Sequence, residues 1–189
     1  MMHKSLTILF VVSGLAATPA SANPDDWDSA SSVVRTALVA AAIGTPLIED
    51  DDEGLRQSAY SLGTAFLVTE GLKRTFPETR PDGSDNRSFP SGHTSVSFAA
   101  AATLQQRHGW DVGIPAHLAA AFVGVARHEA GKHHWHDVLV GAAIGEASGL
   151  LLTSNRHRNV VGSPPAAFAV AVIPWGDTSG GGITFAARF

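Results

Sequence analysis

Cysteine is absent from this sequence of 189 residues, and charged residues make up only 16% of it. The lack of cysteine excludes disulfide bonds and thiolate metal ligands. Acidic residues outnumber basic ones and leave a net charge of −4, so no broad basic surface predicts binding to nucleic acid. The cations that matter for function are therefore expected to be local ones.

Long apolar runs are also absent. The predicted helices carry apolar runs of about 10 to 16 residues, whereas a membrane-spanning helix needs about 20. Polar residues interrupt or flank these runs, namely Thr69, Glu70, Gln105 and Glu146. The sequence therefore favours a soluble or peripherally attached helical protein, with contact to a membrane surface left open.

The first 22 residues have the pattern of a secretory signal peptide. Lys4 supplies a positive start, residues 6–15 are largely apolar, and small residues at 20–22 fit a cleavage site. A retained membrane anchor is the alternative, but the apolar stretch is short for a span. We therefore expect residues 1–22 to be removed and the mature chain to work in the periplasm.

The rest of the chain is rich in alanine and glycine and is long enough to bury one core. Its apolar pattern and its proline and glycine positions predict an all-α bundle over residues 23–160. Helices are expected at 33–48, 55–75, 93–106, 116–128 and 133–152, with a polar loop at 23–32 and a turn at 111–115. Residues 161–189 are expected to form a linker and a C-terminal β-hairpin, with strands at 167–174 and 182–189.

A first pair of functional candidates lies where the second predicted helix runs into a loop rich in proline, aspartate and glycine. Lys73 is near the end of that helix and Arg80 is in the loop, so both side chains can fold onto one anion. Arginine offers a planar fork of donors, and lysine offers a point charge. Taken alone, such a pair is more often two solvated surface cations.

A second group is the run Pro90-Ser91-Gly92-His93, which leads into the third predicted helix. Backbone amides at a helix start carry partial positive charge and bind anions. Ser91 can add a hydroxyl donor, and Gly92 lets an anion approach the backbone closely. His93 stands where it could protonate a departing oxygen. An ordinary helix cap with an exposed histidine is the alternative.

The third group contains Arg127, His133 and Asp137. His133 and Asp137 are four residues apart and share a face if this segment is helical. The carboxylate could then accept a hydrogen bond from one imidazole nitrogen and leave the other basic, as in a nucleophile. His133 could attack phosphorus in line and become a phosphohistidine.

The histidines of this segment also raise the possibility of a metal site. Zinc sites on one helix use two histidines four residues apart, as in His-Glu-x-x-His. After His128-Glu129 the next histidine is His133, so this spacing fails. We therefore expect no metal, and His134 and His136 to lie at the rim of the pocket or in packing contacts.

Together the three groups resemble the signature of the type 2 phosphatidic acid phosphatase (PAP2) superfamily, which also includes class A acid phosphatases and vanadium haloperoxidases. That signature is Lys-x6-Arg-Pro, then Pro-Ser-Gly-His, then Ser-Arg-x5-His-x3-Asp. The chain matches its order and internal spacing, and the similarity spans residues 55–152. One position departs, because Ala126 stands where the family usually has serine.

The resemblance implies a compact bundle of about five to six helices, as in other helical bundles built around a site. It implies that His93 is a general acid, that His133 is the nucleophile and that Asp137 orients it. It also implies no metal or other cofactor. The residues implied to hold phosphate are Lys73, Arg80, Ser91, Gly92 and Arg127.

The sequence thus predicts a phosphatase that hydrolyses phosphomonoesters or pyrophosphates outside the cytoplasm. Its substrate is expected to be a phosphorylated small molecule or lipid, and the sequence does not decide between them. A vanadate-dependent haloperoxidase and a non-catalytic envelope binding or structural protein are the alternatives. The oligomeric state is not predicted.

Overall fold

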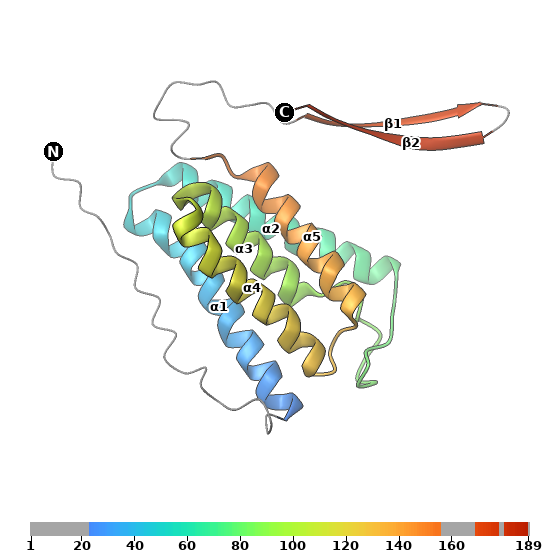
Figure 1. Ribbon diagram of the computed structural model, residues 1–189, viewed down its shortest axis with the longest axis horizontal. Coiled ribbons are helices and arrows are strands. Elements are labelled where there is room, and N and C mark those ends of the chain that lie inside the picture. Colours follow the sequence, from blue (N-terminus) through green and yellow to red (C-terminus); the bar gives the residue numbers. More distant parts are fainter. Residues whose placement is uncertain (1–22, 156–168, 178–179, 189) are drawn as a thin grey trace.

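The computed structural model describes residues 23–155, together with the backbone of 169–177 and 180–188. Residues 23–155 form a bundle of helices that run alongside one another (Figure 1), which confirms the predicted all-α fold. The helices are α1 (Pro24–Ile48), α2 (Asp52–Thr75), α3 (Gly92–His108), α4 (Trp110–Glu129) and α5 (Trp135–Leu152).

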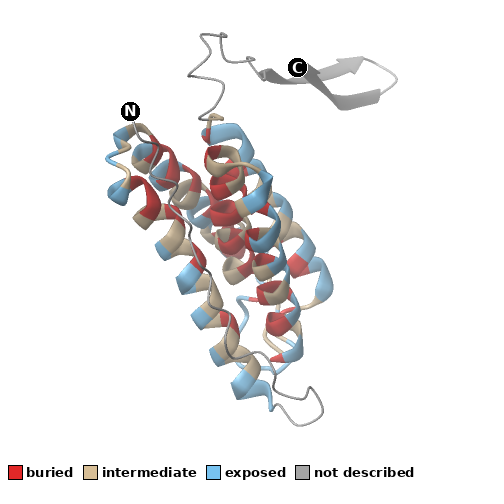
Figure 2. Ribbon diagram, turned by 60° about the vertical axis from the view of Figure 1, so that its left-hand side comes forward, coloured by how far each residue is buried: buried red, intermediate tan, exposed pale blue. Residues whose placement is uncertain are grey.

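Helix α3 is the centre of the bundle and packs against each of the other four helices. Its residues Ala99, Ala100, Ala101 and Ala102 are fully buried, because small side chains allow neighbouring helices to approach on every side. Buried residues lie mainly in the interior of the bundle, and exposed residues lie along its outside (Figure 2). The main apolar cluster joins α1, α3 and α4 through Leu38, Ala42, Ala100, Ala101, Leu104, Ala116 and Ala120.

A seam of glycines brings α5 unusually close to α3. A Cβ atom at Gly145 would lie 2.1 Å from the carbonyl oxygen of Ser95, so no larger residue fits without a shift. The same close approach holds the two helix starts together, where the Ser91 amide donates to the Asp137 carbonyl at 3.0 Å. The glycines of this seam are Gly141, Gly145 and Gly149.

Helix α1 begins at Pro24, so the expected loop at 23–32 is wrong. Asn23 caps the helix by accepting from the Asp26 amide, and the Asp26 carboxylate accepts in return from the Asn23 amide. Pro24 occupies the first turn, where its missing N–H costs nothing. The polar residues of this segment therefore begin the helix, and α1 is about two turns longer than predicted.

The expected turn at 111–115 is also wrong, because α4 begins at Trp110. Gly109 alone separates α3 from α4, with a φ of 83° that favours glycine. Helix α5 begins at Trp135 and not at residue 133, so His133 precedes the helix.

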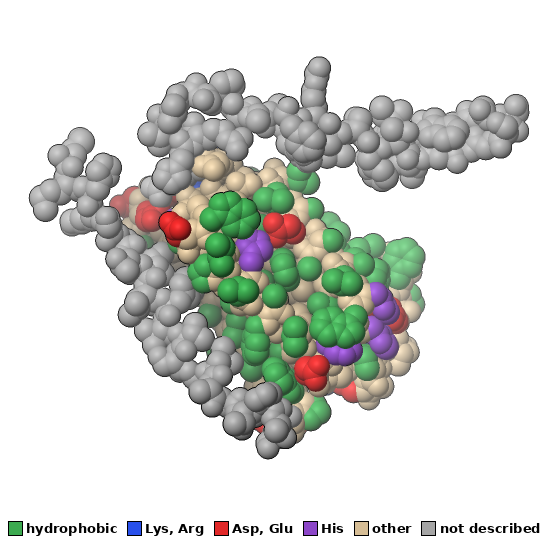
Figure 3. All heavy atoms as spheres, in the orientation of Figure 1, with side chains coloured by type: hydrophobic (Ala, Val, Ile, Leu, Met, Phe, Trp, Pro, Cys, Tyr) green, Lys and Arg blue, Asp and Glu red, His purple; other side chains and the backbone are tan. Residues whose placement is uncertain are grey.

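Large apolar side chains remain exposed on several helices. In Figure 3 hydrophobic side chains are spread over the face formed by α4 and α5. Within the described part of the chain, α1 is the one helix long and apolar enough to cross a membrane by length and composition. A signal sequence or the core helix of a soluble protein meets the same criterion. Exposed residues on α4 and α5 include Ile114, Leu118, Val125, Trp135, Leu139, Leu150 and Leu151.

Two antiparallel strands follow the bundle, β1 (Ala169–Asp177) and β2 (Gly180–Arg188). Their register places Ala169 opposite Arg188 and Asp177 opposite Gly180. Their side chains lie outside the described residues, as do the predicted linker and signal peptide. The predicted C-terminal β-hairpin therefore stays a prediction.

Candidate active site

Lys73 lies in the last turn of α2 and is buried beneath the loop that leads to α3. Its ammonium donates to the carbonyls of Arg87 at 2.6 Å, Ser88 at 3.2 Å and Pro90 at 2.6 Å. Burial, with the nearby charge of Arg80, lowers the pKa of Lys73 to about 8. All three N–H donors thus hold this loop in place.

Arg80 extends from the same loop toward the segment that carries His133. Its Nε donates to Asp85 at 2.6 Å, and its Nη1 donates to the carbonyl of Lys132 at 3.2 Å. The loop itself is fastened to that segment by the Asp82 amide, which donates to the Gly131 carbonyl at 3.0 Å. The first and third sequence groups, about fifty residues apart, are therefore direct neighbours.

The predicted helix start after Pro90 is confirmed, since α3 begins at Gly92 and Ser91 is its N-cap. The Ser91 hydroxyl lies 2.8 Å from that of Thr94. A Cβ atom at Gly92 would meet only ordinary contacts, 3.7 Å from Thr69 and 3.9 Å from Lys73. Protein neighbours therefore do not demand glycine at position 92, and its phosphate contact stays a prediction.

His133 and Asp137 are both buried, with exposures of 2% and 0%. The distance from His133 Nδ1 to Asp137 Oδ2 is 3.6 Å, which is longer than a hydrogen bond. Burial lowers the pKa of His133 despite Asp137, and the charges of Arg127, Lys73 and Arg80 lower it further. The imidazole is therefore neutral near pH 7, with a lone pair free for chemistry.

The carboxylate of Asp137 is held rigidly from two directions. Its Oδ2 accepts from the Ser88 hydroxyl at 2.6 Å and from the His134 amide at 2.9 Å. Burial opposes ionisation, but these bonds and His133 together lower the pKa of Asp137 to about 2. Asp137 is therefore a fixed negative charge behind His133 at any pH where the protein works.

His93 is in the first turn of α3, and its Nε2 lies 3.2 Å from the Ser32 hydroxyl of α1. Burial, with the charges of Arg127 and Arg35, lowers the pKa of His93 to about 3. His93 is therefore neutral in this structure near pH 7. A general acid must carry a proton, so the predicted role requires a bound anion to raise this pKa.

Arg127 is near the end of α4 and is almost completely buried. Its Nη1 donates to the Asp28 carboxylate of α1, and it lies 3.4 Å from the Ser31 hydroxyl. The preceding residue, Ala126, is fully buried in the bundle. The N-terminal turns of α1 therefore supply direct contacts to two candidate residues, His93 and Arg127.

A model of the PAP2 superfamily matches residues 54–160, which is more than half of the chain. This chain belongs to the PAP2 superfamily. The resemblance drawn from the three motifs is thereby confirmed.

Two relatives of this PAP2 protein are curated lipid A phosphatases. It is 37% identical over 91 residues to a lipid A 1-phosphatase of Porphyromonas gingivalis, a match that covers 45% of this chain and 20% of that protein. It is 30% identical over 115 residues to a lipid A 4′-phosphatase of Helicobacter pylori, which covers 55% and 58% respectively. The chain thus spans less than two thirds of either relative.

The crystal structure of Aquifex aeolicus LpxE shares the fold of this PAP2 protein. The TM-score is 0.60 at 23% sequence identity, and the match covers 72% of this chain and 87% of that one. The predicted fold class is therefore confirmed both by the helices themselves and by this likeness.

The region matched by the PAP2 model includes all three motifs but leaves out α1. Asp28 and Ser32 could not be recognised from the motifs, and their segment was expected to be a loop. Ser88 lies two residues before Pro90, but the sequence gives it no role. The structure shows that its hydroxyl donates to Asp137.

Proposed function

We propose that this chain is a phosphatase that transfers a phosphoryl group to His133 and then to water. The observation that carries this proposal is the buried imidazole of His133, which lies 3.6 Å from the Asp137 carboxylate and whose pKa is lowered by burial and by the charges of Arg127 and Arg80. A neutral imidazole is a nucleophile, and fixed cations stabilise the charge that develops on the transferred group.

The proposed first step forms a bond from His133 Nε2 to phosphorus and breaks the bond to the leaving oxygen. When the phosphate dianion binds, it raises the pKa of His93, which takes up a proton from solvent and donates it to that oxygen. In the second step a water molecule attacks phosphorus, the P–N bond breaks, and neutral His93 takes the proton from the water. Inorganic phosphate leaves, His93 releases this proton to solvent, and both histidines return to their starting forms.

The phosphate is proposed to lie against Arg80, Arg127 and the amides at the start of α3. Arg127 can reach it by exchanging its contact with Asp28, whose side chain is 40% exposed. Lys73 acts indirectly. Its ammonium donates to three carbonyls and so holds in place the loop that carries Ser91. Because these charges and amides suffice to bind phosphate, the proposed reaction needs no metal.

A phosphorylated lipid is the substrate class that the surroundings favour. Large apolar side chains close in sequence to the motif residues are exposed, and such apolar surface can contact a membrane that carries the substrate. The named activities of both curated relatives are consistent with this class. These exposed residues are Phe76, Val125, Trp135 and Leu139.

The test compares phosphate release from a lipid phosphate in mixed micelles with release from a soluble aryl phosphate. We expect faster turnover of the lipid, loss of turnover in His133→Ala, and a radiolabelled phosphoenzyme on rapid quenching. If His133→Ala turns over as fast as the unaltered chain, the proposed nucleophile is wrong. If the unaltered chain releases no phosphate from either substrate, the proposed activity is wrong.

The place of work is proposed to be the periplasm, after removal of residues 1–22. The pattern of the N-terminal residues supports this, because Ala20-Ser21-Ala22 precedes the helix cap Asn23. Mass spectrometry of the chain recovered from cells tests it. A mature chain that begins at Asn23 is expected, and an intact N-terminus would show a retained anchor.

A further inference from the structure

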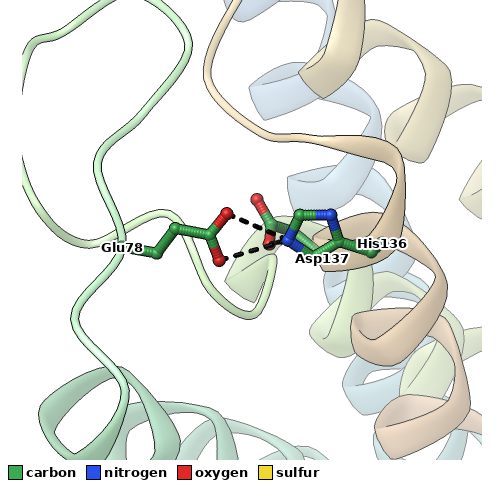
Figure 4. A group of neighbouring side chains, drawn as sticks. All are labelled: Glu78, His136 and Asp137. Carbon is green, nitrogen blue, oxygen red and sulfur yellow. Dashed lines mark hydrogen bonds and ion pairs between the residues drawn. The ribbon is translucent and has the colours of Figure 1, made fainter.

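Three side chains converge beside the candidate active site with atoms suited to hold a cation. Figure 4 shows Glu78 and His136 facing each other, with Asp137 beside them. One ligand atom from each lies within 4.8 Å of the other two. His136 Nε2 is 3.0 Å from Glu78 Oε1 and 3.0 Å from Asp137 Oδ1.

The Oδ1 oxygen of Asp137 is a separate observation that points to a ligand. Oδ2 accepts two hydrogen bonds, whereas Oδ1 accepts none of good geometry from the described residues, although it is completely buried. Buried polar atoms without a hydrogen bond are uncommon, because removing them from water is costly. His136 Nε2 lies 3.0 Å from this oxygen, so Oδ1 is directed into the group.

The three side chains come from two elements that the fold holds in place. Glu78 lies in the loop after α2, where its amide donates to the Asn86 carbonyl at 3.2 Å and its carbonyl accepts from the Ser88 amide at 2.9 Å. His136 and Asp137 lie in the first turn of α5. His136 is exposed, so an ion from solvent can reach the group on that side.

We propose that Glu78, His136 and Asp137 bind a divalent cation of the zinc class. An imidazole nitrogen with two carboxylate oxygens suits Zn²⁺, whereas Mg²⁺ prefers oxygen ligands alone. Ligand atoms about 2.0 Å from a tetrahedral zinc ion lie about 3.3 Å from each other. The two 3.0 Å separations at His136 Nε2 are close to that spacing, and the separation between the two carboxylate oxygens is within 4.8 Å.

A cation at this place acts on the neighbouring chemistry, an effect that rests on the proposed function. Bound to Asp137 Oδ1, it draws negative charge away from the carboxylate that lies behind His133. It also fastens the loop of Glu78 to the start of α5. The proposed phosphatase is therefore inhibited by Zn²⁺ at this group, and the cation takes no part in the reaction.

Isothermal titration calorimetry with Zn²⁺ on the chain without an affinity tag tests the site. We expect one saturable site, with a Kd at least tenfold weaker in His136→Gln and in Glu78→Gln. Circular dichroism on heating provides a second readout, because Zn²⁺ should raise the Tm of the unaltered chain more than that of either variant. Mg²⁺ at the same concentrations should not raise the Tm of the unaltered chain or of either variant.

His117→Gln is the matched control, because His117 Nε2 also lies 3.0 Å from a carboxylate, that of Glu146, but is not part of this three-residue group. Its loss should leave the Kd for Zn²⁺ unchanged. The proposal is overturned if the unaltered chain shows no saturable binding, or if His136→Gln binds as tightly as the unaltered chain. It is also overturned if His117→Gln weakens binding as much as His136→Gln.

Phosphate release measured with and without Zn²⁺ separates this proposal from the proposed function. Zn²⁺ should inhibit the unaltered chain and should inhibit His136→Gln much less. Binding without any phosphatase activity would leave the metal site standing and remove the proposed function. Phosphatase activity without Zn²⁺ binding would leave the proposed function standing and remove the metal site.

Discussion

Arg127, a motif residue on α4, donates a hydrogen bond to the carboxylate of Asp28 on α1, a helix outside the region matched by the family model. Arg127 is 4% exposed, and this partner compensates its buried positive charge within the bundle. A phosphate that binds Arg127 comes close to the Asp28 carboxylate, whose negative charge opposes its binding. The first turns of α1 therefore influence both the stability of the site and its affinity for anions.

Asp28→Asn is expected to tighten the binding of inorganic phosphate or vanadate about two- to fivefold, since it removes a competing negative charge that is partly screened by solvent. The same change should lower the free energy of unfolding by about 1 kcal/mol, because Arg127 loses a charged hydrogen-bond partner. Inhibition constants and urea unfolding measure the two effects. Asp25→Asn, an exposed change in the same turn, is the control, and weaker phosphate binding in Asp28→Asn would contradict the competition.

Ser88→Ala should raise the pKa of Asp137 and reduce kcat about tenfold, because the carboxylate loses the hydroxyl that donates to Oδ2 at 2.6 Å. The unfolding free energy should fall by about 1.5 to 3 kcal/mol, as is typical of a bond to a charged group. Ser97→Ala is a matched control, since Ser97 is equally buried and its hydroxyl has no hydrogen-bond partner among the described residues. Equal losses in both variants would argue against a specific role for Ser88.

Gly145→Ala is expected to destabilise the bundle by about 1 to 3 kcal/mol, the usual cost of overpacking. The added Cβ would lie 2.1 Å from the Ser95 carbonyl and would push α5 from α3. Gly63→Ala in α2 is the control, because its Cβ would meet nothing within 4 Å and alanine favours a helix. Thermal unfolding should show a lower Tm for the first variant and an equal or higher one for the second.

The ratio kcat/KM should fall as the pH rises through about 8, where Lys73 loses its proton. Its pKa lies below the ordinary value of 10.5, so the charged form is present below about pH 8 and lost above it. The neutral amine keeps only two donors for three carbonyls, and the loop that carries Ser91 is held less firmly. In Lys73→Arg the fall of kcat/KM above about pH 8 should disappear, even if kcat/KM is lower at every pH. If the fall persists in this variant, another group causes it.

Much of the fold could be predicted from local sequence patterns. The ends of α2 and α3 and the start of α3 at the Pro90-Ser91-Gly92 turn follow from proline and glycine, whose backbone limits act locally. The first turns of α1 carry an equally local signal, the capping pair Asn23 and Asp26, which was misread because polar residues also form loops. The early start of α4 has no such signal beyond Gly109.

The candidate site divides in the same way. The motif spacing predicted that His133, Asp137, Arg80 and Arg127 belong to one site, because the three motifs occur together in one family. Their partners could not be predicted, because Asp28, Ser32 and Ser88 reach the motif residues only through helix packing. Packing over long sequence separations depends on how all the helices fit together, which no local pattern records.

By itself, the sequence determined that this protein is a helical PAP2 chain whose three motif cations, Lys73, Arg80 and Arg127, stand at the spacing of that family. The tertiary structure decided what those groups do to each other: it buried His133, which lowers its pKa, and gave the three donors of Lys73 to a loop. It also paired Arg127 with Asp28 and set Asp137 beside Glu78 and His136. The physical reason is that charge, burial and hydrogen bonding depend on distances in space, and the close contact of α3 and α5 fixes those distances.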